Sequence, residues 1–409
     1  MLVGSYDCTQ GRAPERAWQE RKTQLMYAHF RIAVAACAVG CLANNASTMR
    51  SWAQQSVETS NQPAPVETMK AMPVPVWPND DRIQLIGRID DRNPLKPRMA
   101  YPGTEIRIRM RGASLGLSMT SDSDKSALTI VIDHGAPRLQ LLHKGPNDLS
   151  IAVPVEGDHT IEIIKRTETW QGVLTFESIS LPEGTSLLMP PVRSARKLMF
   201  VGDSVTCGAG VNNNATCKPD LESPASDAYN SYGLLLGRRL DAETQLVCYG
   251  GRGLVRDYRG LAIQDNVLNA PQFLALSIPS DAPEGRVAWD ASRFQPDAVL
   301  FSLGTNDFSL QKTKPLDEQK WIGAYVELLQ SARLLYPKAK FLVTEGAIVR
   351  DPLLRSMLQK AVAELGDPLV SYTPSQHYPG NGCDGHPTAA QHLQMTDDFE
   401  PIFRAKLGW

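Results

Sequence analysis

Four residues in the C-terminal half of the chain are of types that carry out nucleophilic chemistry, and each directly follows an apolar run or lies in a polar loop. Ser204 lies in the sequence GDS, Gly251 in GGRG, Asn306 in GTND and His386 in DGHP. A serine hydroxyl becomes a nucleophile when a histidine accepts its proton. Glycine N–H groups and an asparagine amide can stabilise the oxyanion that such an attack on a carbonyl produces.

Each motif alone has a plainer interpretation. GDS is common at helix caps, GGRG is typical of a turn, and Asp307 of GTND is expected to cap the following helix. His386 lies in a polar loop rich in glycine and proline rather than on an apolar face, so a buried structural histidine is disfavoured there. The four motifs in this order form a much stronger signal than any one of them.

The segments around these motifs alternate between strand-like and helix-like patterns. The predicted strands are 197–201, 245–249, 298–302 and 341–344, and the predicted helices are 229–240, 317–335 and 353–365. This alternation predicts an α/β domain with a parallel sheet covered on both faces. Ligands bind beyond the carboxyl ends of the strands in such sheets, which is where the four motifs fall.

Residues 79–188 show a different pattern, with short strands separated by turn signals. Glu105–Arg111 and Thr160–Ile164 alternate strictly between apolar and polar residues, and 128–132 and 172–179 are rich in strand-forming residues. Glu156-Gly157-Asp158 is expected to be one of the turns. The pattern predicts an all-β sandwich, specifically a jelly roll.

The first 43 residues resemble an export leader. The apolar run IAVAACAVGCLA (32–43) is too short to span a bilayer as a helix but has the length of a secretory signal, with a start at Met26. The sequences before Cys37 and Cys41 also resemble lipoprotein cleavage boxes, so either cysteine is a candidate lipid anchor. Residues 44–78 are rich in proline and are expected to form a linker. The chain is therefore predicted to be exported, as a secreted, periplasmic or lipid-anchored protein.

Composition narrows the classes of partner. Hydrophobic residues make up 42% of the chain, charged residues 21%, and the net charge is −2, so a nucleic-acid partner is not expected. No close pair of cysteines suggests zinc, and no metal or other cofactor is predicted. Cys207 and Cys217 flank a loop and are candidates for a disulfide, with free thiols as the alternative.

The order of the four motifs resembles the SGNH hydrolase superfamily over residues 195–409. The resemblance narrows to carbohydrate esterase family 2 through the preceding β-domain and the sequences GDSVTCGAG, GGRGLVR, WDASRFQPD, LGTNDFS and CDGHP. It implies a jelly-roll domain followed by a three-layer α/β/α catalytic domain. It also implies removal of acetyl groups from polysaccharides such as xylan or mannan, so the expected partner is an acetylated polysaccharide or oligosaccharide.

The resemblance also implies roles for the motif residues. Ser204 attacks the acetyl carbonyl, His386 acts as general base, and the oxyanion contacts the N–H groups of Ser204 and Gly251 and the Asn306 side chain. The superfamily usually places an aspartate three residues before the histidine, but here that position is Cys383. Either Asp384 or a backbone carbonyl is therefore expected to orient His386.

Aromatic side chains that could stack on sugar rings are harder to assign. Tyr258 and Trp289 are the candidates for substrate binding, although Trp289 precedes an apolar strand and packing is a strong alternative. Trp321 lies in a helical pattern and is expected in the core. Rival functions are an SGNH lipase or thioesterase of another acyl specificity, and a non-catalytic carbohydrate-binding surface lipoprotein. The oligomeric state is left open by the sequence.

Overall fold

The computed structural model describes residues 74–212, 222–378, 380 and 385–409. The predicted leader, Cys217, Cys383 and Asp384 lie outside the described residues, so the export signal, the lipid anchors at Cys37 and Cys41 and the role of Asp384 remain predictions. Within the described ranges, no helix is both long enough and apolar enough to cross a membrane.

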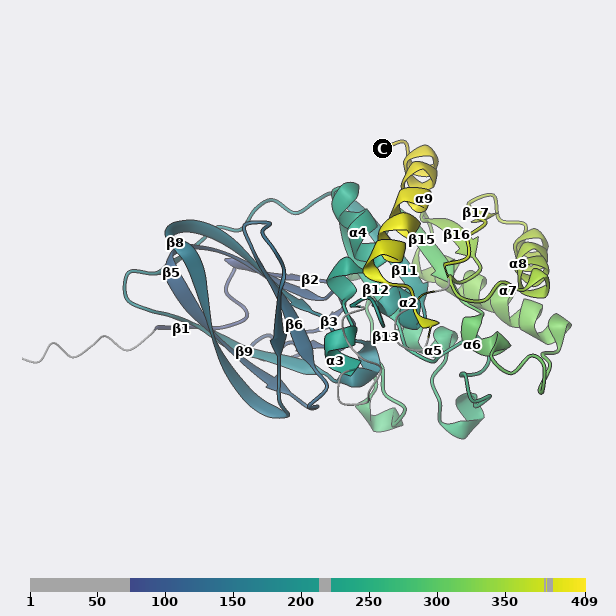
Figure 1. The fold of residues 1–409 in the computed structure, drawn as a ribbon, viewed down its shortest axis with the longest axis horizontal. Coiled ribbons are helices and arrows are strands. Elements are labelled where there is room, and N and C mark those ends of the chain that lie inside the picture. Colours follow the sequence, from purple (N-terminus) through teal and green to yellow (C-terminus); the bar gives the residue numbers. More distant parts are fainter. Residues whose placement is uncertain (1–73, 213–221, 379, 381–384) are drawn as a thin grey trace, which may run out of the picture. The chain divides into compact units, whose positions relative to one another are not determined.

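The N-terminal part is an antiparallel β-domain, as predicted (Figure 1). Its strands are β1 (Val74–Val76), β2 (Ile83–Ile86), β3 (Ile89–Asp90), β4 (Arg98–Met99), β5 (Glu105–Ser121), β6 (Ala127–Ile132), β7 (Arg138–Leu141), β8 (Gly145–Lys165), β9 (Leu174–Leu181) and β10 (Ser186–Leu188). All ten belong to one hydrogen-bonded sheet, which forms a half-barrel around a single apolar cluster. The 3-10 helix η1 (Thr169–Gln171) connects β8 to β9.

The long strands β5 and β8 pair along almost their whole length and organise this domain. Alternate residues of β5, such as Ile106 and Ile108, are fully buried, as expected for a strand with one face on a core. The turn predicted at Glu156-Gly157-Asp158 is wrong. These residues lie inside β8, where Gly157 pairs with Gly112 and a register shift follows, so a bulge lets the pair bend without breaking it.

The predicted linker also extends too far toward the domain. Val74–Val76 forms β1 and pairs with β9, opposite Ile179–Leu181. A proline is compatible with a strand when its position needs no backbone donor, and Pro75 lies in the middle of β1. The strand was not predicted because its sequence, VPV, lies within a proline-rich stretch typical of a linker.

The C-terminal part contains a five-stranded parallel sheet with the order β12-β11-β15-β16-β17. Its strands are β11 (Arg196–Gly202), β12 (Ala242–Cys248), β15 (Ala298–Ser302), β16 (Lys340–Thr344) and β17 (Val370–Tyr372). All neighbouring pairs are parallel, so their carboxyl ends meet at one edge. A separate hairpin is formed by β13 (Leu276–Ile278) and β14 (Val287–Ala288).

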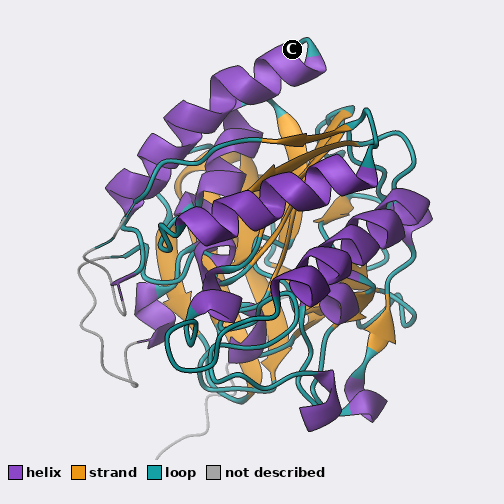
Figure 2. Ribbon diagram, turned by 90° about the vertical axis from the view of Figure 1, so that its right-hand side faces the viewer, coloured by secondary structure: helices purple, strands orange, loops and turns teal. Residues whose placement is uncertain are grey.

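Helices cover both faces of the parallel sheet (Figure 2). The longer ones are α4 (Tyr232–Arg239), α7 (Glu318–Leu335), α8 (Pro352–Leu365) and α9 (Ala389–Leu407), and the shorter ones are α2 (Ser204–Cys207), α3 (Glu222–Ala225), α5 (Ala270–Leu274) and α6 (Thr305–Phe308). The remaining 3-10 turns are η3 (Ala228–Asn230), η4 (Ile263–Asp265), η5 (Pro283–Gly285) and η6 (Ala291–Arg293). One apolar cluster joins the sheet to α5, α7 and α8, and another joins its opposite face to α2, α4 and α9. The predicted α/β/α arrangement is confirmed.

Candidate active site

The nucleophile and base lie at the carboxyl edge of the parallel sheet. Ser204 lies two residues after the end of β11, at the start of α2. Its Oγ is 2.7 Å from Nε2 of His386, which lies 182 residues later, just before α9. Both side chains are only partly buried, so a substrate can reach them. When His386 is neutral with its lone pair on Nε2, the Ser204 hydroxyl donates to that nitrogen, which is the geometry of an activated serine.

The turn that presents Ser204 depends on the preceding aspartate. Asp203 is the N-cap of α2, and its Oδ1 accepts a hydrogen bond of 3.0 Å from the Val205 N–H. Burial raises the pKa of the Asp203 carboxyl, while this backbone bond opposes the rise. Because α2 has only four residues, its local N–H groups rather than a helix dipole are available to an oxyanion.

The predicted oxyanion residues come from the neighbouring strand ends. Gly251 follows β12 and Asn306 follows β15, on either side of β11. Nδ2 of Asn306 donates to the carbonyl of Arg252 at 2.9 Å, which uses one of its two amide hydrogens and ties the two loops together. Gly251 has φ of +74°, and a side chain there would come within 3.0 Å of the Tyr258 ring. The positive φ favours glycine at this position, and a side chain would also crowd the Tyr258 ring.

Asp307 lies inside α6 and does not cap the following helix, which corrects the prediction for it. It instead fixes the loop after β12 that begins at Gly251, here called the oxyanion loop. This fully buried carboxylate accepts hydrogen bonds from the backbone N–H groups of Leu254, Val255 and Arg256, at 2.8, 2.9 and 3.3 Å. Burial raises its pKa to about 6 and the three N–H donors oppose that rise. Its effect is to fix the segment that begins at Gly251.

A disulfide joins the first two motifs. It links Cys207 at the end of α2 to Cys248 at the end of β12. The predicted pairing of Cys207 with Cys217 is therefore wrong, as is the alternative that all four cysteines of the two domains are free. Sequence proximity favoured Cys217, but the parallel pairing of β11 with β12 brings Cys248 beside Cys207.

The second histidine of this region, His392, has a structural role. His392 lies on α9 and is fully buried, and its Nδ1 accepts a hydrogen bond from the Tyr232 N–H at 3.1 Å. Burial lowers its pKa to about 3, so it stays neutral. His377 lies exposed in the loop that precedes His386.

The two aromatic candidates for sugar binding are separated by the structure. Tyr258 is 55% exposed and lies beside Gly251, within the site. Trp289 lies between the guanidinium groups of Arg88 and Arg293, 5.0 and 5.2 Å from its ring centre, and packs on the core of the sheet. These contacts favour packing for Trp289, the alternative weighed above, whereas its role in substrate binding remains a prediction. Trp321 is buried as predicted.

Sequence reasoning missed the contribution of the β-domain to the site. Trp170 of η1 is 38% exposed, and it lies with Glu168 against Gly250, where any side chain would collide with both. Thr169 Oγ1 donates to the carbonyl of Cys248 at 2.6 Å, which anchors η1 on the end of β12. The only signal was an isolated tryptophan between two strands, which carries no information about its distant neighbour.

The arrangement is suited to hydrolysis of an ester through a covalent acyl-enzyme. In such a reaction Ser204 would attack the carbonyl, and Nε2 of His386 would receive its proton and return it to the leaving alkoxide. The predicted oxyanion donors are the N–H groups of Ser204 and Gly251 and the second amide hydrogen of Asn306. Within the described residues, no group of three or more histidine, cysteine or acidic side chains is placed to hold a metal ion.

Comparison with known proteins identifies a family for each of the two domains. Residues 85–191 match the model for the carbohydrate esterase 2 N-terminal domain, and 200–393 match that of the GDSL-like lipase/acylhydrolase family. An acetylxylan esterase / glucomannan deacetylase of Cellvibrio japonicus is 33% identical over 81% of this chain and 90% of its own length.

Solved structures show the same two-domain fold. A family two carbohydrate esterase from Cellvibrio japonicus superposes with a TM-score of 0.76 at 31% identity, covering 82% of this chain and 98% of that one. A family two carbohydrate esterase from Clostridium thermocellum, in complex with cellohexaose, has a TM-score of 0.71 at 27% identity, over 80% and 99% of the two chains. The chain belongs to carbohydrate esterase family 2.

Proposed function

We propose that this esterase removes O-acetyl groups from a plant-type polysaccharide, such as xylan or glucomannan, through an acetyl-enzyme intermediate. The observation that carries the proposal is the 2.7 Å contact between Ser204 Oγ and His386 Nε2 beside the oxyanion loop. The 33% identical relative bears the name acetylxylan esterase / glucomannan deacetylase, which supports this substrate class.

The surroundings of the dyad favour a sugar over a long acyl chain. Tyr258 and Trp170 flank the glycine loop with exposed rings, and sugar rings present apolar faces that can stack on them. A cavity of about 690 Å³ beside the loop after β16 is lined largely by polar and charged side chains. A lipase would need a broad apolar pocket for its acyl chain. These features support the deacetylase over the lipase or thioesterase.

We also propose that the protein is exported. The disulfide between Cys207 and Cys248 supports an oxidising compartment, since such bonds seldom persist in a reducing cytosol. The apolar run at 32–43 and the candidate anchors Cys37 and Cys41 remain predictions. Detection of the protein in membrane-free culture fluid, in the periplasm or in the envelope fraction would decide between the forms of export, whereas a cytosolic location would contradict all of them.

The decisive test of the activity is acetate release from acetylated xylan and acetylated glucomannan by the full chain. Release that disappears in Ser204→Ala would support both the reaction and the nucleophile. Hydrolysis of a small aryl acetate without release from either polysaccharide would leave the dyad in place and refute the substrate class. Full activity of Ser204→Ala would refute the nucleophile.

A further inference from the structure

The carboxyl edge of the sheet continues past the dyad into a cavity that the reaction itself does not use. This cavity, about 690 Å³, lies beyond the end of β16 and beside the start of α8, and pockets for small ligands are commonly about 300–1,000 Å³. Its lining residues include Glu345, Arg350, Asp351, Arg355, Gln359 and His377.

The cavity adjoins the catalytic residues through two short connections. Gly346 in its wall packs against the side chain of Thr305, the neighbour of Asn306, leaving no room for a side chain at 346. The Tyr378 N–H donates to the carbonyl of Ala347 at 2.9 Å, which attaches this wall to the segment that leads to His386. These two contacts place one wall of the cavity beside the residue that precedes Asn306 and beside Tyr378.

The acidic groups of the cavity are already engaged. Glu345 receives two hydrogen bonds on Oε1 from Arg355, at 2.5 and 2.9 Å, and a third on Oε2 from the Tyr372 hydroxyl. Asp351 is the N-cap of α8, and its Oδ1 accepts from the Leu353 N–H at 2.9 Å. The charges of Glu345 and Arg355 neutralise one another. The charge of Asp351 lies at the positive N-terminal end of a 14-residue helix.

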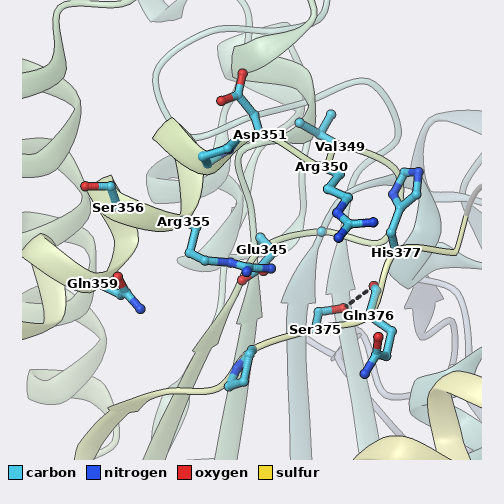
Figure 3. A pocket seen from close by; sticks show the side chains of 13 residues that line it. Glu345, Val349, Arg350, Asp351, Arg355, Ser356, Gln359, Ser375, Gln376 and His377 are labelled. Atoms are coloured by element: carbon cyan, nitrogen blue, oxygen red, sulfur yellow. Dashed lines mark hydrogen bonds and ion pairs between the residues drawn. The ribbon is translucent and has the colours of Figure 1, made fainter.

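Arg350 is a positively charged side chain of the cavity that takes no part in these hydrogen bonds. Its guanidinium is exposed and extends into the cavity on the side of Gln376 and His377 (Figure 3). Across the ranges that the structure describes, it forms neither an ion pair nor a hydrogen bond. Ser356, Gln359 and Gln376 add neutral polar groups that suit sugar hydroxyls.

We propose that this cavity binds a carboxylate-bearing sugar, a uronic acid residue of the acetylated glycan, with Arg350 as the carboxylate-binding group. The proposal rests on the proposed function and narrows its substrate to acidic glycans. A guanidinium matches a carboxylate with two parallel N–H···O bonds, and this pairing is stronger than a neutral hydrogen bond. The neutral polar side chains around Arg350 can form hydrogen bonds with the hydroxyl groups of the same sugar.

The test compares two acetylated xylo-oligosaccharides that differ only at one branch. One carries glucuronic acid, and the other carries the same branch with its carboxyl reduced to an alcohol. Acetate release by the full chain is expected to show kcat/KM about 10-fold higher for the acidic branch, mainly through KM, because a hydrogen-bonded charge pair contributes about one power of ten in affinity. Arg350→Met should remove the preference and keep the activity on the neutral branch.

Arg138→Met is the matched control, since Arg138 is an exposed arginine on β7 of the other domain. This variant should keep the preference. Equal kcat/KM for the two branches in the unmodified chain, or a preference that survives in Arg350→Met, would overturn the proposal.

Binding separates this proposal from the proposed function. Calorimetric titration of Ser204→Ala with unacetylated xylotriose carrying one glucuronic acid, and separately with trigalacturonate, needs no turnover. Binding of either that weakens about 10-fold in Ser204→Ala/Arg350→Met supports the uronic acid site even if no acetate is ever released, and the better ligand tells whether the acid belongs to a branch or a backbone. Binding of neither, or binding indifferent to Arg350, refutes the site.

Discussion

The junction between the two domains and the carboxyl edge of the parallel sheet both place polar side chains in largely buried surroundings, yet they use them differently. At the junction, Arg88 of the β-domain is 1% exposed and donates to the carbonyls of Leu274 and Leu276, at 2.6 and 3.1 Å, and to the Tyr336 hydroxyl at 3.1 Å. Its guanidinium also lies over the Tyr101 and Trp289 rings.

At the carboxyl edge of the parallel sheet, the polar side chains keep part of their hydrogen-bonding capacity for a substrate. Ser204 and His386 meet one another but remain partly exposed, and Asn306 uses one amide hydrogen on Arg252 and retains the second. The comparison shows that a buried polar group indicates chemistry only when part of its hydrogen-bonding capacity is left unused and within reach of solvent. Mutations should therefore lower stability at the junction and lower turnover at the edge.

The largest effect is expected for Ser204→Ala. Loss of the nucleophile should lower kcat/KM for an acetate ester by at least about 10⁴-fold. The free energy of unfolding should change by less than about 0.5 kcal/mol, because the hydroxyl supports no buried network. Steady-state kinetics and urea denaturation would check both parts. Ser186→Ala in β10 is the control. A large loss of stability in Ser204→Ala would contradict the expectation that residues at the sheet edge act on turnover rather than on stability.

Asn306→Ala should follow. Removing one oxyanion donor costs about 10²–10³-fold in kcat, and KM should change little because the donor acts on charge that develops during the reaction. The lost bond to the Arg252 carbonyl should lower stability by only about 1 kcal/mol. A change confined to KM would show that Asn306 binds the ground state instead.

Arg88→Met should show the opposite pattern. Two backbone carbonyls lose their donor in a buried site, so the free energy of unfolding is expected to fall by about 3 kcal/mol. Turnover measured well below the melting temperature should remain within about twofold of normal, since Arg88 touches no reacting atom. A large fall in kcat with unchanged melting would contradict the division between junction and edge.

Asp307→Asn tests a residue that belongs to both classes. An amide offers one oxygen to three N–H donors and places an NH2 group against them, so stability should fall by about 2 kcal/mol. Because those donors belong to the oxyanion loop, kcat should fall about 10-fold at the same time, with less effect on KM. Loss of stability with unchanged kcat would assign Asp307 to packing alone.

The smallest effect is expected for Tyr258→Ala. An exposed ring beside Gly251 should contribute about 1 kcal/mol to glycan binding, seen as a several-fold rise in KM on a polysaccharide with no change on a small aryl acetate. Trp289→Ala is the matched aromatic control and should lower stability without raising KM. The reverse result for the two variants would assign glycan binding to Trp289 instead of Tyr258.

Local patterns in the sequence determined the two folds and the motifs that follow the strands of the parallel sheet. A strand of the parallel sheet is a short apolar run, and its carboxyl end carries the functional residue, so GDS, GGRG and GTND could be assigned from position alone. The strict alternation in β5 likewise marks a half-buried strand. Ser204 and His386 could be paired across 182 residues only because the family resemblance supplied the partner.

Only the tertiary structure decided the contacts between distant segments, because neither segment carries a local signal for the other. The bond from Cys207 to Cys248 spans 41 residues, the bond from Leu254 to Asp307 spans 53, and Thr169 reaches Cys248 across 79. Strand order sets these pairings, and strand order is not encoded in the period of any single segment. The same reason separated Tyr258 from Trp289, because whether an aromatic ring is free for a sugar depends on which distant side chains already lie against it.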